Sequence, residues 1–267
     1  MKLTDTHAHL DKFANDGTLA DVLARARAAG VERIITCATT PHEWKLYREI
    51  ASENAGIFWQ AGIHPTEIAD GDDTALDALP ALFLDDPFAP VAIGEIGLDY
   101  HFLPDDPAEA EKVKSRQREI FARQLRIAAD LGKKVCVHAR DSVADCIAEI
   151  ERAKLDFSNV VFHCFAGTPQ QLRELNERGA RGSFTGIITY KSAGEMREAM
   201  LAQGLEKLML ETDCPYLAPA PHRGKTCEPW MVSETAKAAA ELFGVSAECL
   251  AEQTEQNVRE FFNAIHL

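Results

Sequence analysis

Short apolar segments alternate along this chain with longer segments that are apolar on one face only. The longer segments have the spacing of amphipathic helices, as between Val113 and Leu131, where apolar residues recur every few positions. The short segments have the length of buried β-strands. We expect strands over residues 3–9, 33–38, 58–64, 91–96, 134–138, 160–163, 182–186 and 207–213.

The order of these elements predicts the fold. Helical segments end at Gly132 and Gly179, and a strand follows each within a few residues. Eight strands with helical crossovers in 267 residues favour an α/β fold, a closed (β/α)8 TIM barrel, with a doubly wound open sheet as the alternative. Because no repeat or linker divides the chain, we expect one barrel domain over residues 1–267, with helices over 230–243 and 247–262 packed outside it.

Side chains that can bind metal ions stand at the carboxyl ends of the predicted strands. His7 and His9 share one face of the first strand, about 7 Å apart. An isolated pair of this kind is more often a strand cap and a solvated side chain. Further such groups follow other strands, however, and the carboxyl ends of barrel strands meet on one face, where active sites lie. The pattern predicts a metal site among His7, His9, His64, Glu95, His138, His163 and Asp213.

Charge and cysteine content narrow the classes of function. The formal net charge of −14 argues against a protein that binds long duplex nucleic acid, because such binding depends on lysines and arginines that neutralise phosphates. The protein would bind a nucleic-acid substrate only at an end or over a few nucleotides, and metal ions would supply the positive charge. The seven cysteines include no C-x-x-C pair, which favours free thiols, and no apolar run approaches the roughly 18 residues of a membrane span. We therefore expect a cytoplasmic protein without a membrane partner, and a monomer.

A series of short motifs resembles a known family. The motifs are DTHAHLD (5–11), GIHP (62–65), GEIGLDY (94–100), VHARD (137–141), HCF (163–165), ETDCPYLAP (211–219) and HRGK (222–225). Together they are similar to the TatD family of metal-dependent deoxyribonucleases, within the amidohydrolase-like barrels. The chain departs from the family at Cys214, where Ser or Ala is usual, and at Cys227, where Asn is usual.

The resemblance implies a site for two divalent metal ions. One ion would be held by His7, His9, Glu95 and Asp213, and the second by Glu95, His138 and His163, with Glu95 bridging. It also implies Mg-dependent cleavage of single-stranded DNA from the 3′ end. The imidazoles instead favour Zn, Mn, Fe or Co over Mg, because Mg²⁺ prefers oxygen ligands. The identity of the metal stays open.

The expected catalytic residues are Asp213, Glu95 and His64. Two cations roughly 3.5 to 4 Å apart can activate a shared water and stabilise the leaving oxygen of a phosphodiester. Asp213 would accept the proton of that water. His64 would hydrogen-bond a substrate phosphate, and Arg223 and Lys225 would bind substrate in the same way.

Two other functions stay open. Hydrolysis of an amide or ester is one, although related barrels often bridge their metals with a modified lysine where this chain has Glu95. A non-catalytic metal-binding scaffold is the other. Asp99 and Arg140 either orient the neighbouring ligands or are ordinary charges at the rim.

Overall fold

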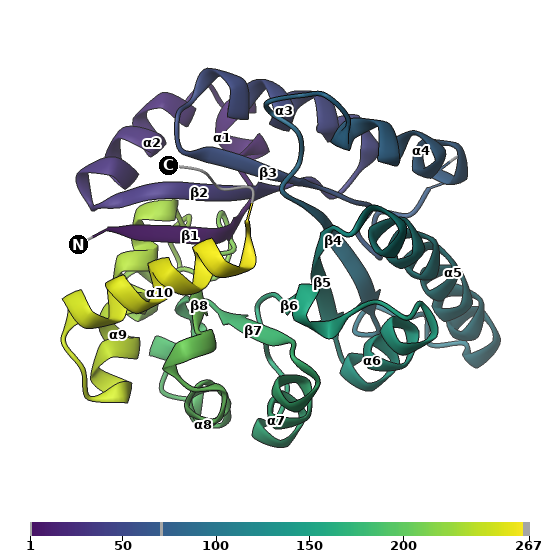
Figure 1. Cartoon of the computed structure of the whole chain (residues 1–267). Helices are drawn as coiled ribbons and strands as arrows, with labels where there is room; N and C mark the ends of the chain where they lie inside the picture. The colour runs from purple at the N-terminus through teal and green to yellow at the C-terminus, as the bar shows by residue number, and fades with distance from the viewer. Residues whose placement is uncertain (1, 70–71, 264–267) are drawn as a thin grey trace.

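Parallel strands form one sheet whose order in space is the order in the chain (Figure 1). The computed structural model describes residues 2–69 and 72–263. The strands are β1 (Leu3–Ala8), β2 (Val31–Cys37), β3 (Ile57–Ala61), β4 (Ala92–Asp99), β5 (Lys134–Arg140), β6 (Val160–Phe162), β7 (Arg181–Phe184) and β8 (Met209–Leu210). Each strand pairs in parallel with the next. This arrangement confirms the predicted (β/α)8 barrel.

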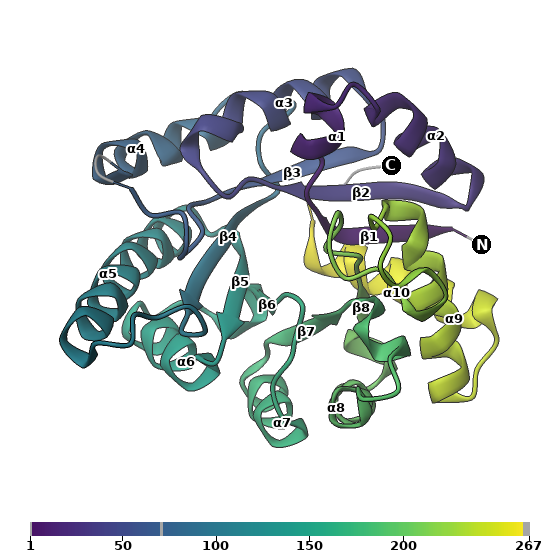
Figure 2. The same ribbon diagram turned by 180° about the vertical axis from the view of Figure 1, so that it is seen from behind.

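Helices connect the strands and surround the ring that the strands form (Figures 1 and 2). They are α1 (Asp11–Asn15), α2 (Leu19–Ala28), α3 (Trp44–Glu53), α4 (Asp72–Ala78), α5 (Pro107–Leu131), α6 (Val143–Arg152), α7 (Pro169–Arg178), α8 (Gly194–Gln203), α9 (Val232–Phe243) and α10 (Ala247–Phe261). Local chemistry sets their ends. The Asp106 side chain caps the first amides of α5, and Gly132 ends that helix in a left-handed conformation. Within the described residues, no helix has both the length and the apolar character that crossing a membrane requires.

The segment that follows β8 runs beside β1 and nearly closes the barrel. The backbone N–H of His9 donates to the carbonyl oxygen of Cys214 at 2.7 Å. The N–H of Asp213 donates to the carbonyl oxygen of His7 at 3.0 Å. These contacts bring the two ends of the strand sequence together and place Asp213 next to the paired histidines.

Helix α10 lies across the end of the barrel at which the strands begin, in front of them in Figure 1 and behind them in Figure 2. Val258 and Phe261 of this helix belong to a buried apolar cluster, to which the barrel contributes Ile35, Val91, Ala92, Cys136, Val161 and Met209. Lys134 and Arg181, at the starts of β5 and β7, lie over the Phe261 ring at 5.0 and 4.7 Å. Because apolar groups fill this end, a polar site is left to the opposite end.

Strand boundaries differ from the prediction near the candidate site. β4 continues past Glu95 to Asp99, because Asp99 still pairs with Arg140 of β5. β5 likewise continues past His138 to Arg140. The predictions that Glu95 and His138 end their strands are therefore wrong. β1, β3, β6 and β8 end earlier than predicted, so four candidate residues lie after their strands. These residues are His9, His64, His163 and Asp213.

Candidate metal centre

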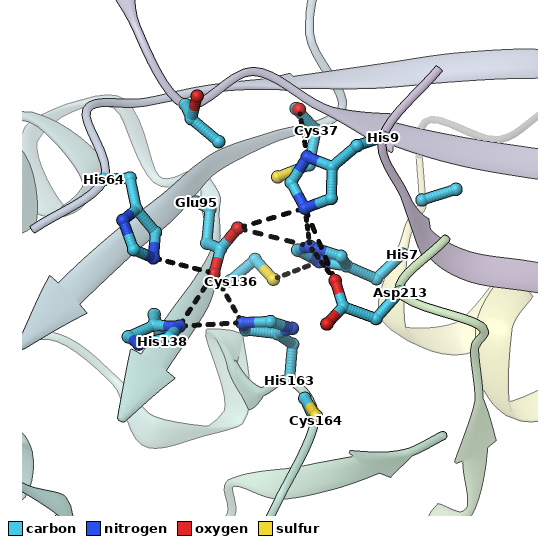
Figure 3. Close-up of polar contacts among 12 residues, drawn as sticks. His7, His9, Cys37, His64, Glu95, Cys136, His138, His163, Cys164 and Asp213 are labelled. Carbon is cyan, nitrogen blue, oxygen red and sulfur yellow. Dashed lines mark hydrogen bonds and ion pairs between the residues drawn. The ribbon is translucent and has the colours of Figure 1, made fainter. Parts of the chain in front are cut away.

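Glu95 lies at the centre of the site, with its carboxylate inside the barrel (Figure 3). The residue is only 3% exposed. Its Oε1 atom lies 2.6 Å from His163 Nε2, 2.9 Å from His138 Nδ1 and 3.3 Å from His64 Nε2. One oxygen of a single carboxylate therefore faces three imidazoles, from β5 and from the loops after β3 and β6.

The second oxygen of Glu95 faces a different set of groups. Glu95 Oε2 lies 3.3 Å from His7 Nε2 and 3.6 Å from His9 Nε2. Asp213 Oδ1 lies 3.4 Å from His9 Nε2 and 3.8 Å from His7 Nε2. The histidines alternate along β1 so that both point inward, and barrel closure supplies the aspartate.

The site thus consists of two halves that share Glu95. We call His7, His9 and Asp213 the His7 half, and His64, His138 and His163 the His138 half. The halves are adjacent, since the His7 and His163 rings stack with their centroids 3.9 Å apart. All the predicted ligands are brought together in this one cluster (Figure 3).

A carbonyl and a thiol lie behind the rings of the His7 half. His9 Nδ1 lies 3.1 Å from the carbonyl oxygen of Cys37, which can only accept a hydrogen bond. A neutral His9 ring therefore carries its proton on Nδ1, and its Nε2 lone pair faces the carboxylates. His7 Nδ1 lies 3.5 Å from Cys136 Sγ, so its Nε2 also faces the centre.

Carboxylates lie behind two rings of the His138 half. His138 Nε2 lies 2.9 Å from Asp99 Oδ2, which leaves Nδ1 facing Glu95. His163 Nδ1 lies 3.6 Å from Glu211 Oε1. A hydrogen-bonded carboxylate in this position, such as Asp99, fixes the orientation of a ligating imidazole and raises its basicity, whereas His163 Nδ1 lies beyond hydrogen-bond distance of Glu211. The sequence left two roles open for Asp99, orienting a ligand or being an ordinary charge at the rim. The contact with His138 fits the orienting role.

His64 is oriented differently from the other four rings. The backbone N–H of Thr66 points at His64 Nδ1 over 3.2 Å, and Thr66 Oγ1 lies 2.8 Å from the same atom. Because a backbone N–H can only donate, Nδ1 accepts, and a neutral ring carries its proton on Nε2. Burial lowers the pKa of His64, which favours the neutral ring. His64 therefore presents an N–H donor to the centre, whereas a metal ligand must present a lone pair.

The charges of the site shift the pKa values of its members. Burial by itself would raise the pKa of Glu95, but the positive charges of His163 and His7 outweigh it and hold the pKa well below its ordinary range. Burial lowers the pKa of His163, yet the charge of Glu95 outweighs it and raises that pKa well above the ordinary value. The carboxylate is thus anionic and the imidazole takes up a proton. A divalent cation would replace such protons.

The donor atoms fit divalent ions at more than one point. Ligand atoms lie within 4.8 Å of one another in three groups: His7, His9 and Glu95; His7, His163 and Glu211; and His64, Glu95 and His138. The third group meets only the distance condition, because the His64 nitrogen that faces it carries a proton. Imidazole nitrogen combined with carboxylate oxygen suits Zn, Mn, Fe and Co, and the buried carboxylate supplies negative charge. The residues present are therefore able to bind metal.

The two predicted substrate-binding cations lie on one exposed loop. Arg223 and Lys225 are exposed on the loop after β8. The Arg223 guanidinium lies 4.6 Å above the Tyr190 ring. In the part of the chain that the structure describes, neither cation forms an ion pair, so both are available to an anionic ligand.

Three residues near the centre were not predicted from the sequence. Glu211 is fully buried, where its carboxylate accepts hydrogen bonds from the N–H of Cys164 and the hydroxyl of Ser183. Cys136 lies beside His7, and Asp5 accepts hydrogen bonds from the N–H and hydroxyl of Thr212 at 2.9 and 2.6 Å. Their spacing in the sequence could have identified them, because each stands two positions before a predicted ligand. The pairs are Glu211 and Asp213, Cys136 and His138, and Asp5 and His7.

Comparison with known proteins identifies the family. The sequence model of the family described as TatD related DNase matches residues 4–263. The chain belongs to the TatD family. An uncharacterized metal-dependent hydrolase, YcfH of Escherichia coli K12, is 36% identical over 266 residues, which cover 98% of this chain and 96% of the relative. These matches establish a TatD family metal-dependent hydrolase.

Two further TatD proteins bear on activity and fold. The 3'-5' ssDNA/RNA exonuclease TatD of Citrobacter koseri is 34% identical over 247 residues, which cover 91% of this chain and 92% of the relative. The crystal structure of YJJV, a TatD homologue from Escherichia coli K12, superposes with a TM-score of 0.87 at 28% identity and covers 98% of each chain. The barrel described here is therefore that of a TatD protein.

Proposed function

We propose that this TatD protein is a metal-dependent phosphodiesterase that trims single-stranded DNA from the 3′ end. One observation carries the proposal: the two carboxylate oxygens of Glu95 face two separate sets of donors. A carboxylate shared between two sets suits a site for a pair of metal ions that acts on both the attacking and the leaving oxygen of a phosphodiester. The exonuclease name of the Citrobacter koseri relative supports the choice of substrate.

The ligands follow from the direction in which each nitrogen points. His7, His9, Glu95 and Asp213 would hold one divalent ion, and Glu95, His138 and His163 the second. When bound, such ions would lower the pKa of a water molecule and neutralise charge on the phosphodiester. The nitrogen-rich set favours Zn, Mn, Fe or Co, and Mg remains a candidate through the family.

Asp213 and His64 are suited to proton and phosphate chemistry. Burial raises the pKa of Asp213, but the neighbouring imidazoles of His9 and His7 outweigh it and lower the pKa, so the carboxylate is anionic and can accept a proton from the attacking water. The Nε2–H of His64 would donate a hydrogen bond to a phosphate oxygen. Arg223 and Lys225 would bind a phosphate of the strand from their exposed loop.

The proposed setting is the cytoplasm, with the protein as a monomer. All seven cysteines are unpaired, and six of them are at least partly buried. Free thiols are typical of a reducing compartment. A monomer is consistent with a cluster whose members all come from one chain, and sedimentation of the purified protein would test it.

Elemental analysis combined with a substrate panel tests the function. We expect purified protein to contain divalent metal, and to release nucleotides from the 3′ end of a single-stranded oligonucleotide labelled at its 5′ end. The panel also contains p-nitrophenyl esters and N-acyl amino acids. Turnover of esters or amides in the absence of phosphodiester cleavage would instead support the amidohydrolase alternative. Bound metal without any turnover would support the scaffold.

A further inference from the structure

A cleft of about 790 Å³ lies beside the His138 half, at the carboxyl end of the barrel. It is lined by Tyr100 and His101, after β4, and by Arg140 and the start of α6. The loop before α7, around Gly167, also lines it. Sites for small ligands typically have volumes of about 300 to 1,000 Å³. The cleft is therefore large enough for a nucleotide.

The cleft begins next to the metal centre. Tyr100 directly follows Asp99, whose carboxylate contacts His138. Arg140 stands two residues after His138 on β5, which corresponds to about 6.6 Å along the strand and to the same face. A substrate whose phosphate lies at the histidines can therefore extend directly into the cleft.

The acidic residues of the cleft already have partners. The Tyr100 hydroxyl donates to Asp145 Oδ2 at 2.8 Å, and Arg118 Nη1 lies 3.6 Å from the same oxygen. Asp141 Oδ2 lies 3.2 Å from His101 Nδ1. These contacts reduce the repulsion that an anion would meet, and they tie the loop after β4 to α6.

Lys114 and Arg140, by contrast, contact aromatic rings of the loop after β4. Lys114 Nζ lies 4.7 Å from the centre of the Tyr100 ring. The guanidinium of Arg140 lies 4.9 Å from the centre of the Phe102 ring. Over residues 2–69 and 72–263, neither cation has an ion-pair partner. In a chain with a net charge of −14, two such cations in one cleft favour an anionic ligand.

Phe102 adds a surface for a planar group. It is 71% exposed, follows His101 at the rim, and packs beside the Arg140 guanidinium. Exposed aromatic rings bind the bases of single strands by stacking, without reading their sequence. A cation and an aromatic ring placed together are complementary to the phosphate and the base of one nucleotide.

We propose that this cleft binds one nucleotide adjacent to the scissile phosphate, with its phosphate at Arg140 and Lys114 and its base on Phe102. The inference rests on the proposed phosphodiesterase function. It restricts strong contacts to one nucleotide, because the described lining of the cleft contributes two fixed cations, Lys114 and Arg140.

Three chromogenic phosphodiesters test the inference with the metal-loaded protein. Bis(p-nitrophenyl) phosphate carries no nucleoside, whereas thymidine 5′-(p-nitrophenyl phosphate) and thymidine 3′-(p-nitrophenyl phosphate) carry one on either side of the phosphate. For Phe102→Ala we expect kcat/KM on one thymidine substrate to fall about tenfold more than on the substrate without a nucleoside. For Lys114→Ala we expect a differential loss of about threefold. The thymidine substrate that responds identifies the side of the scissile bond that the cleft holds.

Matched controls and a binding measurement separate the possible outcomes. Lys112→Ala removes a cation from the same helix that pairs with Glu109, and Leu84→Ala removes an exposed apolar side chain, so both should leave all three rates unchanged. Calorimetry with thymidine 5′- and 3′-monophosphate should show about tenfold weaker binding of one of them to Phe102→Ala.

Equal losses of Phe102→Ala and Lys114→Ala on all three diesters, or no loss and no change in binding, would overturn the cleft assignment while the phosphodiesterase function stands. Failure of the unaltered, metal-loaded protein to hydrolyse any diester would instead overturn the proposed function, and the inference with it.

Discussion

The two halves of the site share Glu95 but differ in what lies behind their imidazoles. In the His7 half, the outer partners are a carbonyl oxygen at His9 and the Cys136 thiol at His7. In the His138 half, they are the carboxylates of Asp99 and Glu211. The His7 half places its additional negative charge, Asp213, at the centre itself.

This difference indicates that the two halves of the site have different roles. A cation in the His7 half would face two carboxylates directly and depend little on its outer partners. A cation in the His138 half would depend on rings made more basic by carboxylates behind them. Asp213 is also more exposed than Glu95, with side-chain exposures of 15% and 3%, so it can meet water and substrate. We infer that proton transfer belongs to the His7 half.

The largest expected effect comes from removing the group that the halves share. Glu95→Ala should lower turnover at least about 10³-fold, because the metal ions contribute several kcal/mol to the reaction and each 1.4 kcal/mol is tenfold. Metal content should fall in the same variant without loss of the fold, since the apolar layers of the barrel are untouched. Elemental analysis, a phosphodiester assay and circular dichroism measure the three quantities. Full activity in Glu95→Ala would show that the carboxylate is not a shared ligand.

The next effect tests whether His64 is a donor rather than a ligand. His64→Ala should keep near-full metal content while turnover falls about 10²-fold, the typical loss when one positioned hydrogen-bond donor is removed. His138→Ala is the matched comparison, since it removes a ligand from the same half. If both variants lose metal to the same extent, His64 is a ligand and its assignment as a phosphate contact is wrong.

A paired substitution tests the difference between the outer partners. Asp99→Asn keeps the shape of the side chain but removes the charge behind His138, and should weaken metal binding about 10- to 100-fold. Cys136→Ala, behind His7, should weaken it less than about fivefold, because a thiol is a poor hydrogen-bond partner. Titration with Zn²⁺ against a competing chelator measures both, with Cys227→Ala as the control for loss of a buried thiol. Equal effects at the two positions would remove the distinction between the halves.

The smallest effect concerns strand length and salt. Since the chain carries −14, each phosphate beyond the metal centre, the Arg223 loop and the cleft should add little binding energy. We expect kcat/KM on single strands to reach a plateau after a few nucleotides, with a shallow dependence on ionic strength. Measurements on oligonucleotides from the dinucleotide upward, at two salt concentrations, provide the test. Continued gains with length and a steep salt slope would reveal a basic track along the surface.

The sequence by itself determined the architecture and which histidines and carboxylates of the strand ends converge, but not the residues behind them. Strand and helix periods are local properties, and alternation along β1 places His7 and His9 on one face whatever the rest of the chain does. Because parallel strands of a barrel end on one face, residues such as His138 were predicted to converge with them before any contact was known.

Only the tertiary structure decided how those residues are arranged. Closure of the barrel sets Asp213 beside β1, although about 200 positions separate them in the chain. The support behind His7 depends on Cys136 and that behind His9 on the carbonyl oxygen of Cys37, each from another strand. Hydrogen-bond direction and distances of a few ångströms depend on packing between segments remote in sequence. Local periodicity carries no information on such packing.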